Sequence, residues 1–260
     1  MARPGRPTPA PVLLLVAHGS RDPRHAATVA SLAERVRWLR PGVRVETAFL
    51  DFTAPRVPRV LERLAAEEAG PVVAVPLLLT RAFHARSDIP AVLRAAGARH
   101  PGLTIRQAAV LGPSPLLRAA LERRLYEAGV RPGDRPSTGV VLACAGTTDP
   151  EAVAVIEGVA RRWRRTGWHA VRPAFASAVR AGGPLSTEDA VRALRAAGCA
   201  RVAVAPYAIA PGRLPDRIAA GAAAAGAEVL AEVLGAAPEV ARLLVRRYAA
   251  AAPQPAMPAV

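Results

Sequence analysis

The chain alternates between short apolar runs and helical patterns, and this alternation constrains the fold more than any other feature. Residues 11–17, PVLLLVA, form a continuous apolar run, which is typical of a strand buried on both faces. Residues 24–39 space their apolar side chains near the helical repeat and stop before Pro41. The pattern continues with strands predicted at 43–50, 72–79 and 103–112 and with helices predicted at 58–69, 89–100 and 115–129. Such an order favours a parallel sheet with helices on both faces.

The same order of elements is then repeated after a linker at residues 131–138, RPGDRPST. GVVLACAG at 139–146 corresponds to PVLLLVAHG, and RVAVAPYAI at 201–209 corresponds to PVVAVPLLL with its proline in place. Strands at 169–177 and 228–235 complete the second set.

This duplication predicts an α/β protein of two similar, flavodoxin-like domains. Each domain is expected to hold a four-stranded parallel sheet covered by helices on both faces. The domains are predicted at 11–132 and 139–251, between disordered tails at 1–10 and 252–260.

The composition supports a packed core and leaves two interpretations of the charge. Hydrophobic residues make up 52% of the 260 residues, which is enough for a core without many aromatics. The net charge is +15, and every basic residue is Arg, so either an anionic partner or a general compositional bias explains it. The arginines are scattered, with no aromatic interleaving and no basic tail, which disfavours nucleic acid as a partner.

Cysteine usage and hydropathy indicate the compartment. Two cysteines, Cys144 and Cys199, do not make a disulfide framework, so we expect a reducing cytoplasm. The opening residues lack the apolar stretch of a signal peptide, and no apolar run reaches the roughly 18 residues that a membrane span needs.

Three residues that bear metal-binding or acid–base chemistry follow successive strands of the first domain. His18 follows the first strand directly, Asp51 follows the second, and His84 lies in a short loop after the third. Asp51 stands 33 residues after His18, and His84 stands 33 residues after Asp51. The carboxyl ends of parallel strands share one edge of the sheet, so the three side chains are expected to meet there. Two imidazoles and a carboxylate suit a divalent transition metal or proton transfer.

The second domain keeps the strands and loses these three residues. The equivalent positions carry Ala145, Ser177 and about Leu214. We therefore expect one active edge and one scaffold edge.

Taken singly, each residue also has a structural interpretation. His18 is then a hydrogen-bonding residue at a helix start, Asp51 the N-cap of the next helix, and His84 a solvated loop residue. The remaining histidines receive no role: His25, His100 and His169.

The string HGSR after a strand allows two further hypotheses. It is suited to cradle an anion at a helix N-terminus. A histidine phosphatase would carry Arg before the histidine, and Ala17 stands there, so a phosphate-ester hydrolase is only a minor alternative. The chain has no phosphate-binding loop of the GxxxxGK[ST] type.

LLVAHGSRDP, VETAFLDFTAP and VPLLLTRAFHARSDIP together resemble the sirohydrochlorin chelatases in their long, internally duplicated form. The resemblance implies a chelatase-like fold and insertion of Fe²⁺ or Co²⁺ into sirohydrochlorin, on the way to siroheme or cobalamin. It implies that His18 and His84 bind the metal and that Asp51 stands where the family commonly has Glu. The family's usual Gly near the second histidine is replaced here by the run 81–83, Arg-Ala-Phe.

The resemblance also implies a substrate with eight carboxylates, held in a cleft between the domains, and no cofactor beyond the metal. Arginine binds carboxylates through paired hydrogen bonds, and an aromatic side chain suits the macrocycle. The residues expected to contact the substrate are Arg21, Arg24, Arg81, Phe83, Arg86 and, from the second domain, Arg213. A monomer is expected because the duplication replaces a dimer. The alternative is a non-catalytic protein of the same fold that delivers metal or tetrapyrrole.

Overall fold

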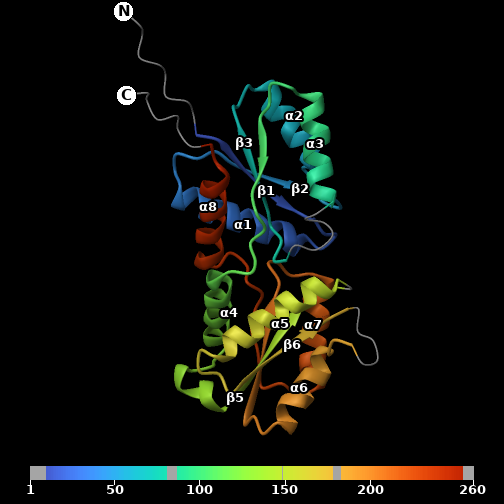
Figure 1. Ribbon diagram of the computed structural model, residues 1–260, viewed down its shortest axis with the longest axis vertical. Helices are drawn as coiled ribbons and strands as arrows, with labels where there is room; N and C mark the ends of the chain where they lie inside the picture. Colours follow the sequence, from blue (N-terminus) through green and yellow to red (C-terminus); the bar gives the residue numbers. More distant parts are fainter. Residues whose placement is uncertain (1–9, 81–86, 148, 178–182, 254–260) are drawn as a thin grey trace, which may run out of the picture.

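Two four-stranded parallel sheets, one in each half of the chain, form the framework of the protein (Figure 1). The computed structural model describes residues 10–80, 87–147, 149–177 and 183–253. The first sheet has the order β2-β1-β3-β4. Its strands are β1 (Val12–Ala17), β2 (Val45–Phe49), β3 (Val72–Pro76) and β4 (Ile105–Gln107). The helices of this half are α1 (Pro23–Leu39), α2 (Val57–Ala66), α3 (Ile89–Arg99) and α4 (Pro115–Glu127).

The second sheet repeats this topology with the order β6-β5-β7-β8. A short 3-10 helix, η2 (Pro132–Ser137), leads into it. Its strands are β5 (Thr138–Cys144), β6 (Ala170–Phe175), β7 (Arg201–Tyr207) and β8 (Val229–Leu230). The helices are α5 (Pro150–Arg164), α6 (Thr187–Ala196), α7 (Arg213–Ala224) and α8 (Pro238–Ala251). The predicted fold class, two similar domains that each contain a four-stranded parallel sheet, is confirmed.

The central strand β1 is buried on both faces, as its continuous apolar run predicts. Leu13 and Leu15 point to one face, where they pack in the core that includes α1. Leu14 and Val16 point to the other face and pack against α2 and α3. All four side chains are at most 1% exposed. Because alternate side chains of the strand point to opposite faces, β1 packs against the helices on both sides of the first sheet.

The last helix of each half packs against the sheet of the other half. α8 contacts α1 and β3 of the first half, and α4 contacts β7 of the second (Figure 1). Tyr248 of α8 donates its hydroxyl hydrogen bond to the carbonyl of Pro11, just before β1 (O···O 2.6 Å). Leu244 is fully buried in a core that also holds Leu13. One continuous core therefore joins the two halves.

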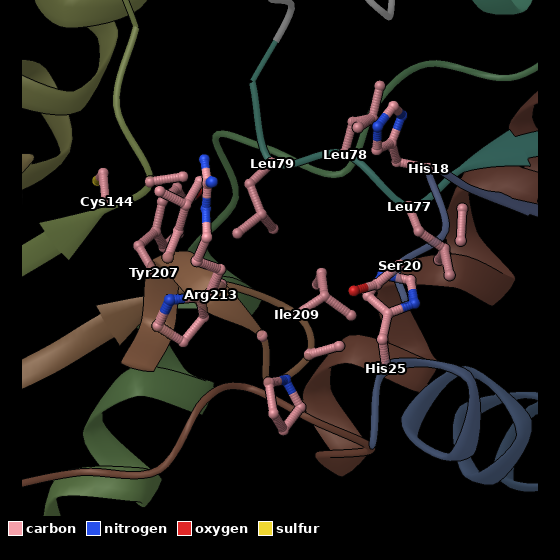
Figure 2. Close-up of a pocket in the computed structure, with 18 of the residues that line it drawn as sticks. His18, Ser20, His25, Leu77, Leu78, Leu79, Cys144, Tyr207, Ile209 and Arg213 are labelled. Carbon is pink, nitrogen blue, oxygen red and sulfur yellow. The ribbon is translucent and has the colours of Figure 1, made fainter. Parts of the chain in front are cut away.

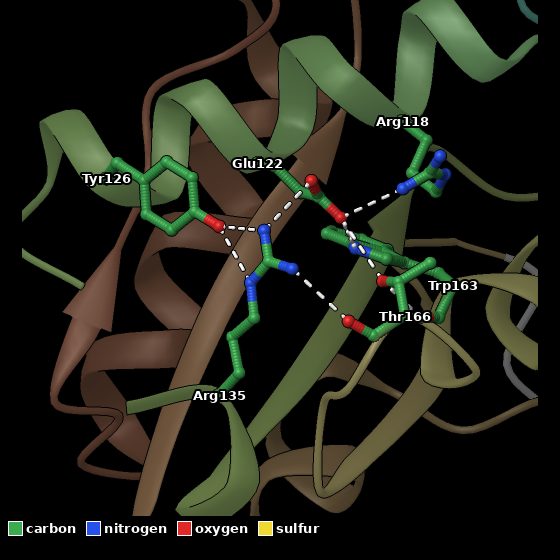
Figure 3. Close-up of polar contacts among 6 residues, drawn as sticks. All are labelled: Arg118, Glu122, Tyr126, Arg135, Trp163 and Thr166. Atoms are coloured by element: carbon green, nitrogen blue, oxygen red, sulfur yellow. Dashed lines mark hydrogen bonds and ion pairs between the residues drawn. The ribbon is translucent and has the colours of Figure 1, made fainter. Parts of the chain in front are cut away.

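A polar cluster around Glu122 fastens α4 to the second half (Figure 3). The Glu122 side chain is 13% exposed and accepts a hydrogen bond from the indole Nε1 of Trp163 in α5 (2.9 Å). It also pairs with Arg118 (3.1 Å) and with Arg135 of the segment between the halves (3.3 Å). Arg135 donates to the hydroxyl of Tyr126 (2.8 Å). The carboxylate is thus satisfied by several donors, as a nearly buried charge requires.

Candidate functional site

A cavity of about 450 Å³ lies between the two halves. Its walls are the loops that follow the carboxyl ends of β1 and β3 in the first half and of β5 and β7 in the second. Figure 2 shows His18 and His25 on one side and Tyr207 and Arg213 on the opposite side. The carboxyl edge of an open parallel sheet is where α/β proteins bind ligands, and here two such edges face one cavity.

His18 stands directly after β1, in a loop that packs tightly on the loop after β2. The backbone N–H of Asp51 donates to the carbonyl of His18 (2.8 Å). Gly19 has φ +95°, and a Cβ added there would lie 1.8 Å from the carbonyl oxygen of Asp51. Only glycine permits this approach. The glycine of the HGSR string therefore brings the His18 and Asp51 loops together.

Ser20 and Thr53 lock the same two loops from the other side. The backbone N–H of Ser20 donates to the Thr53 hydroxyl (3.1 Å), and that hydroxyl donates to the Ser20 carbonyl (2.9 Å). The Ser20 hydroxyl in turn accepts the N–H of Asp22, the N-cap of α1 (3.1 Å). The polar residues after His18 thus position a loop, and none of these contacts pairs a base with Ser20 for acyl transfer.

The carboxylate of Asp51 is half exposed and ionised. It pairs with Arg56 (2.7 Å) and accepts the backbone N–H of Phe52 (2.9 Å). These hydrogen bonds, first that of Phe52 and then that of Arg56, hold the pKa of Asp51 below its ordinary value, and the nearby His18 acts in the same direction. Asp51 does not line the cavity. The sheet edge brings Asp51 next to His18, with its side chain turned toward Arg56.

An exposed aromatic side chain, Phe52, stands beside His18. The two rings meet edge to face with centroids 6.0 Å apart, and the guanidinium of Arg21 lies 5.4 Å from the Phe52 ring centroid. Phe52 is 51% exposed and has φ +59°, which is costly for a residue with a side chain. No sequence motif points to Phe52, because its backbone conformation and its place beside His18 are tertiary features.

His25, which also received no role, proves to line the cavity with His18. It lies in the first turn of α1, seven residues after His18. Burial, and then the nearby His18, lower the pKa of His25, while Asp22 acts in the opposite direction. The sequence position of His25 could have indicated this place, because a residue in the first helical turn after the β1 loop lies near the carboxyl edge of the sheet.

The other predicted site residues differ in whether they line the cavity, pair with a carboxylate, or lie outside the described ranges. Arg24 is paired with Asp22 (2.6 Å) and, across the two halves, with Asp216 of α7 (2.7 Å). Arg213 is exposed, lines the cavity, and has no carboxylate partner among the described residues. Four predicted residues lie outside the described part of the chain: Arg81, Phe83, His84 and Arg86. Within the described ranges, no group of three or more His, Cys, Asp and Glu residues forms a metal-binding cluster.

The second half repeats the loop geometry with different side chains. The N–H of Ala176 donates to the Cys144 carbonyl (2.9 Å), just as Leu50 donates to Ala17 in the first half (2.9 Å). Positions 145 and 177 therefore match positions 18 and 51, and they carry Ala and Ser. The wall that this half adds to the cavity is mostly apolar, with Arg213 as its charged group.

Two parallel sheets whose carboxyl edges face one cavity, with imidazoles on one wall, define a two-domain α/β ligand-binding protein. More particularly, the chain belongs to the CbiX family, because the model of that family matches residues 12–128 and 139–251. The resemblance noted in the motifs is thereby confirmed, and the match falls once on each repeat.

Individual relatives agree with this assignment. The chain is 29% identical over 210 residues to the sirohydrochlorin cobaltochelatase of Priestia megaterium, covering 79% of this chain and 66% of that protein. It is 28% identical over 148 residues to the sirohydrochlorin ferrochelatase of Bacillus subtilis, covering 57% of this chain and 56% of that protein. The matched segments thus span less than two thirds of either relative.

Among solved structures, the chain is similar to SirB from Bacillus subtilis with Fe³⁺. The TM-score is 0.78 at 24% identity, over 92% of this chain and 94% of that one. At that identity the likeness establishes the fold. Across the described residues, each helix is too short or too polar to cross a membrane.

Proposed function

We propose that this protein is a chelatase that inserts Fe²⁺ or Co²⁺ into sirohydrochlorin. The observation that carries the proposal is the cavity between two sheet edges, with His18 on one wall and an apolar wall opposite. Relatives named sirohydrochlorin cobaltochelatase and sirohydrochlorin ferrochelatase support the same reaction.

The reaction replaces two pyrrole N–H protons of the macrocycle with one divalent cation. We assign His18 and His84 as metal ligands, because neutral imidazoles bind Fe²⁺ and Co²⁺ and release them to the four ring nitrogens, a stronger chelator. Asp51 is the third member of the set. Its backbone is bonded to that of His18 and its carboxylate is paired with Arg56, so the carboxylate suits the metal or a pyrrole proton once it turns from Arg56 toward the cavity.

The two walls divide the recognition of the substrate. Ile209 and Leu214 of the second half offer apolar surface to the ring. Arg21, which lies over the Phe52 ring, and Arg213, which lines the cavity, are proposed to bind the carboxylates around the ring. Arg24 joins them when it leaves Asp216. The residues proposed from the sequence alone complete the set: Arg81, Phe83 and Arg86.

The first repeat, residues 11–132, is proposed to carry the chemistry, and residues 139–251 to be a degenerate repeat that closes the cavity. Siroheme and cobalamin both remain candidate end products, since cobalt- and iron-inserting relatives match the chain. The buried free thiols of Cys144 and Cys199 are compatible with a reducing cytoplasm. We propose a monomer, because both walls come from one chain.

An anaerobic absorbance assay tests the activity. Purified protein is mixed with sirohydrochlorin and either Co²⁺ or Fe²⁺, and the spectrum of the metallated ring is followed over time. We expect insertion faster than in the mixture without protein, and a rate reduced at least about 100-fold by His18→Ala or His84→Ala. Spectral change no faster than the uncatalysed mixture would favour the delivery protein.

A further inference from the structure

We propose that His25 is a further metal-binding residue of the cleft, which takes the divalent cation on Nε2 beside the His18 edge. The inference rests on the proposed function for the identity of the cation. It adds a residue of the chain that neither the sequence motifs nor the relatives assign.

The place of His25 puts its ring on the cavity wall. It lies in the first turn of α1, and its ring packs on that of Phe49, with centroids 6.2 Å apart. Phe49 ends β2 and is 3% exposed, so it forms a fixed support. His18 and His25 line the same cavity, and they are close enough for charge on His18 to lower the pKa of His25.

The two ring nitrogens of His25 have different surroundings. Nδ1 is buried and has no hydrogen-bond partner among the described residues. Nε2 is the nitrogen left to reach the cavity that the residue lines. A purely structural histidine would normally satisfy a buried nitrogen, since leaving one without a partner costs about 1–3 kcal/mol. We therefore place the function of His25 at Nε2, on the side of the cavity.

The donor chemistry of His25 suits a divalent cation. A neutral imidazole offers the nitrogen lone pair that Fe²⁺ and Co²⁺ bind. A ligand histidine that binds tightly usually donates its other N–H to a carboxylate or carbonyl. Nδ1 of His25 has no such acceptor among the described residues. The site should therefore hold the metal loosely, as a residue that passes an ion onward must.

Co²⁺ binding to the whole protein, without tetrapyrrole, tests the proposal. The visible absorption of bound Co²⁺ is titrated for wild type, His25→Gln, His25→Cys and the control His100→Gln, whose histidine lies outside the cleft lining. We expect affinity to fall roughly ten-fold or more in His25→Gln and to stay unchanged in His100→Gln. His25→Cys should keep Co²⁺ bound and add a thiolate-to-cobalt charge-transfer band. The native thiols, Cys144 and Cys199, give the baseline in wild type.

Equal Co²⁺ affinity in His25→Gln and wild type would overturn the proposal, as would a Co²⁺ complex of His25→Cys without the charge-transfer band. The insertion assay separates this result from the proposed function. If wild type inserts metal but the Co²⁺ affinity does not change on substitution of His25, only the His25 site is rejected. If Co²⁺ binding depends on His25 but the protein shows no insertion activity, only the proposed chelatase function is rejected.

Discussion

The backbone N–H of Asp51 donates a hydrogen bond to the carbonyl of His18, with the two atoms 2.8 Å apart. Two residues from different strand ends are thereby fixed at one edge of the first sheet. The second half joins the equivalent positions of this corner by a different bond, in which the Ser177 side-chain hydroxyl donates to the carbonyl of Ala145 (2.9 Å). The repeat thus preserves the corner and changes the side chains, which separates what the fold requires from what the chemistry requires.

Replacing Gly19 should break this corner. A Cβ at Gly19 would lie 1.8 Å from the Asp51 carbonyl oxygen, and φ is +95°. We expect Gly19→Ala to lower the free energy of unfolding by about 3 kcal/mol or more, measured by chemical denaturation. Gly129→Ala is the matched control, because Gly129 has φ +98° with open space around its Cβ position. It should cost only about 1–2 kcal/mol. Equal losses would mean that the contact with Asp51 contributes nothing.

The exchange of terminal helices predicts long-range destabilisation. Leu244 of α8 is fully buried in the core it shares with the first sheet. Leu244→Ala should cost about 2–5 kcal/mol, and hydrogen exchange should speed up in β1 and β3, although the substitution lies in the second repeat. Leu230→Ala, at a side chain 42% exposed, should have a much smaller effect. Faster exchange confined to the second sheet would contradict this packing.

The ion pair of Arg123 in α4 with Glu239 in α8 predicts a pH-dependent contribution to stability. The hydrogen bonds from Arg123, 2.5 Å for the shortest, lower the pKa of Glu239 below 4.5. Because the folded pKa is depressed, the stabilisation is complete above pH 4.5 and is lost as the pH falls through the folded value. Glu239→Gln should therefore lower stability by about 1–3 kcal/mol at pH 7, and the difference from wild type should shrink in acid.

The control for that experiment is Glu62→Gln, which removes an exposed pair with Arg59. Its cost should stay below about 0.5 kcal/mol at either pH. A Glu239→Gln penalty that persists unchanged in acid would show that charge on Glu239 is not its source.

Substitutions at Arg24 and its partner Asp216 should change the KM for the substrate rather than the stability of the fold. Its pair with Asp216 joins the two halves, and both side chains are more than half exposed. Asp216→Asn should leave Arg24 paired with Asp22 alone, free its contact with α7 for a substrate carboxylate, and lower the KM for sirohydrochlorin roughly two- to five-fold. Arg24→Gln should raise KM. A KM that is unchanged by both substitutions in the insertion assay would remove Arg24 from the substrate site.

The local pattern of the sequence predicts the central strands well. It predicts poorly the segments before α4 and α8, where the chain passes from one half to the other. The continuous apolar runs locate β1 and β3, because strands buried on both faces have that pattern. The run at 103–112 predicts a long strand, whereas β4 covers Ile105–Gln107. Val110 and Leu111 are buried because the chain passes through the core there on its way to α4. A buried connecting segment therefore has the same apolar sequence pattern as a buried strand.

The strand at 228–235 is overestimated for the same reason, since β8 covers Val229–Leu230. Its buried Leu234 lies where the chain crosses toward α8. Among the site residues, the positions of His18 and Asp51 follow from strand ends and the repeat length. Those of His25 and Phe52 depend on a helix turn and a left-handed backbone angle, which spacing does not encode.

The most direct test makes the first corner identical to the second. The double variant His18→Ala, Asp51→Ser carries the side chains that Ala145 and Ser177 place at the equivalent corner, so the fold should tolerate it. We predict that Co²⁺ insertion into sirohydrochlorin falls to the uncatalysed rate while the unfolding midpoint stays close to that of wild type. Insertion at a rate within about two-fold of wild type would contradict the assignment of the chemistry to the first edge.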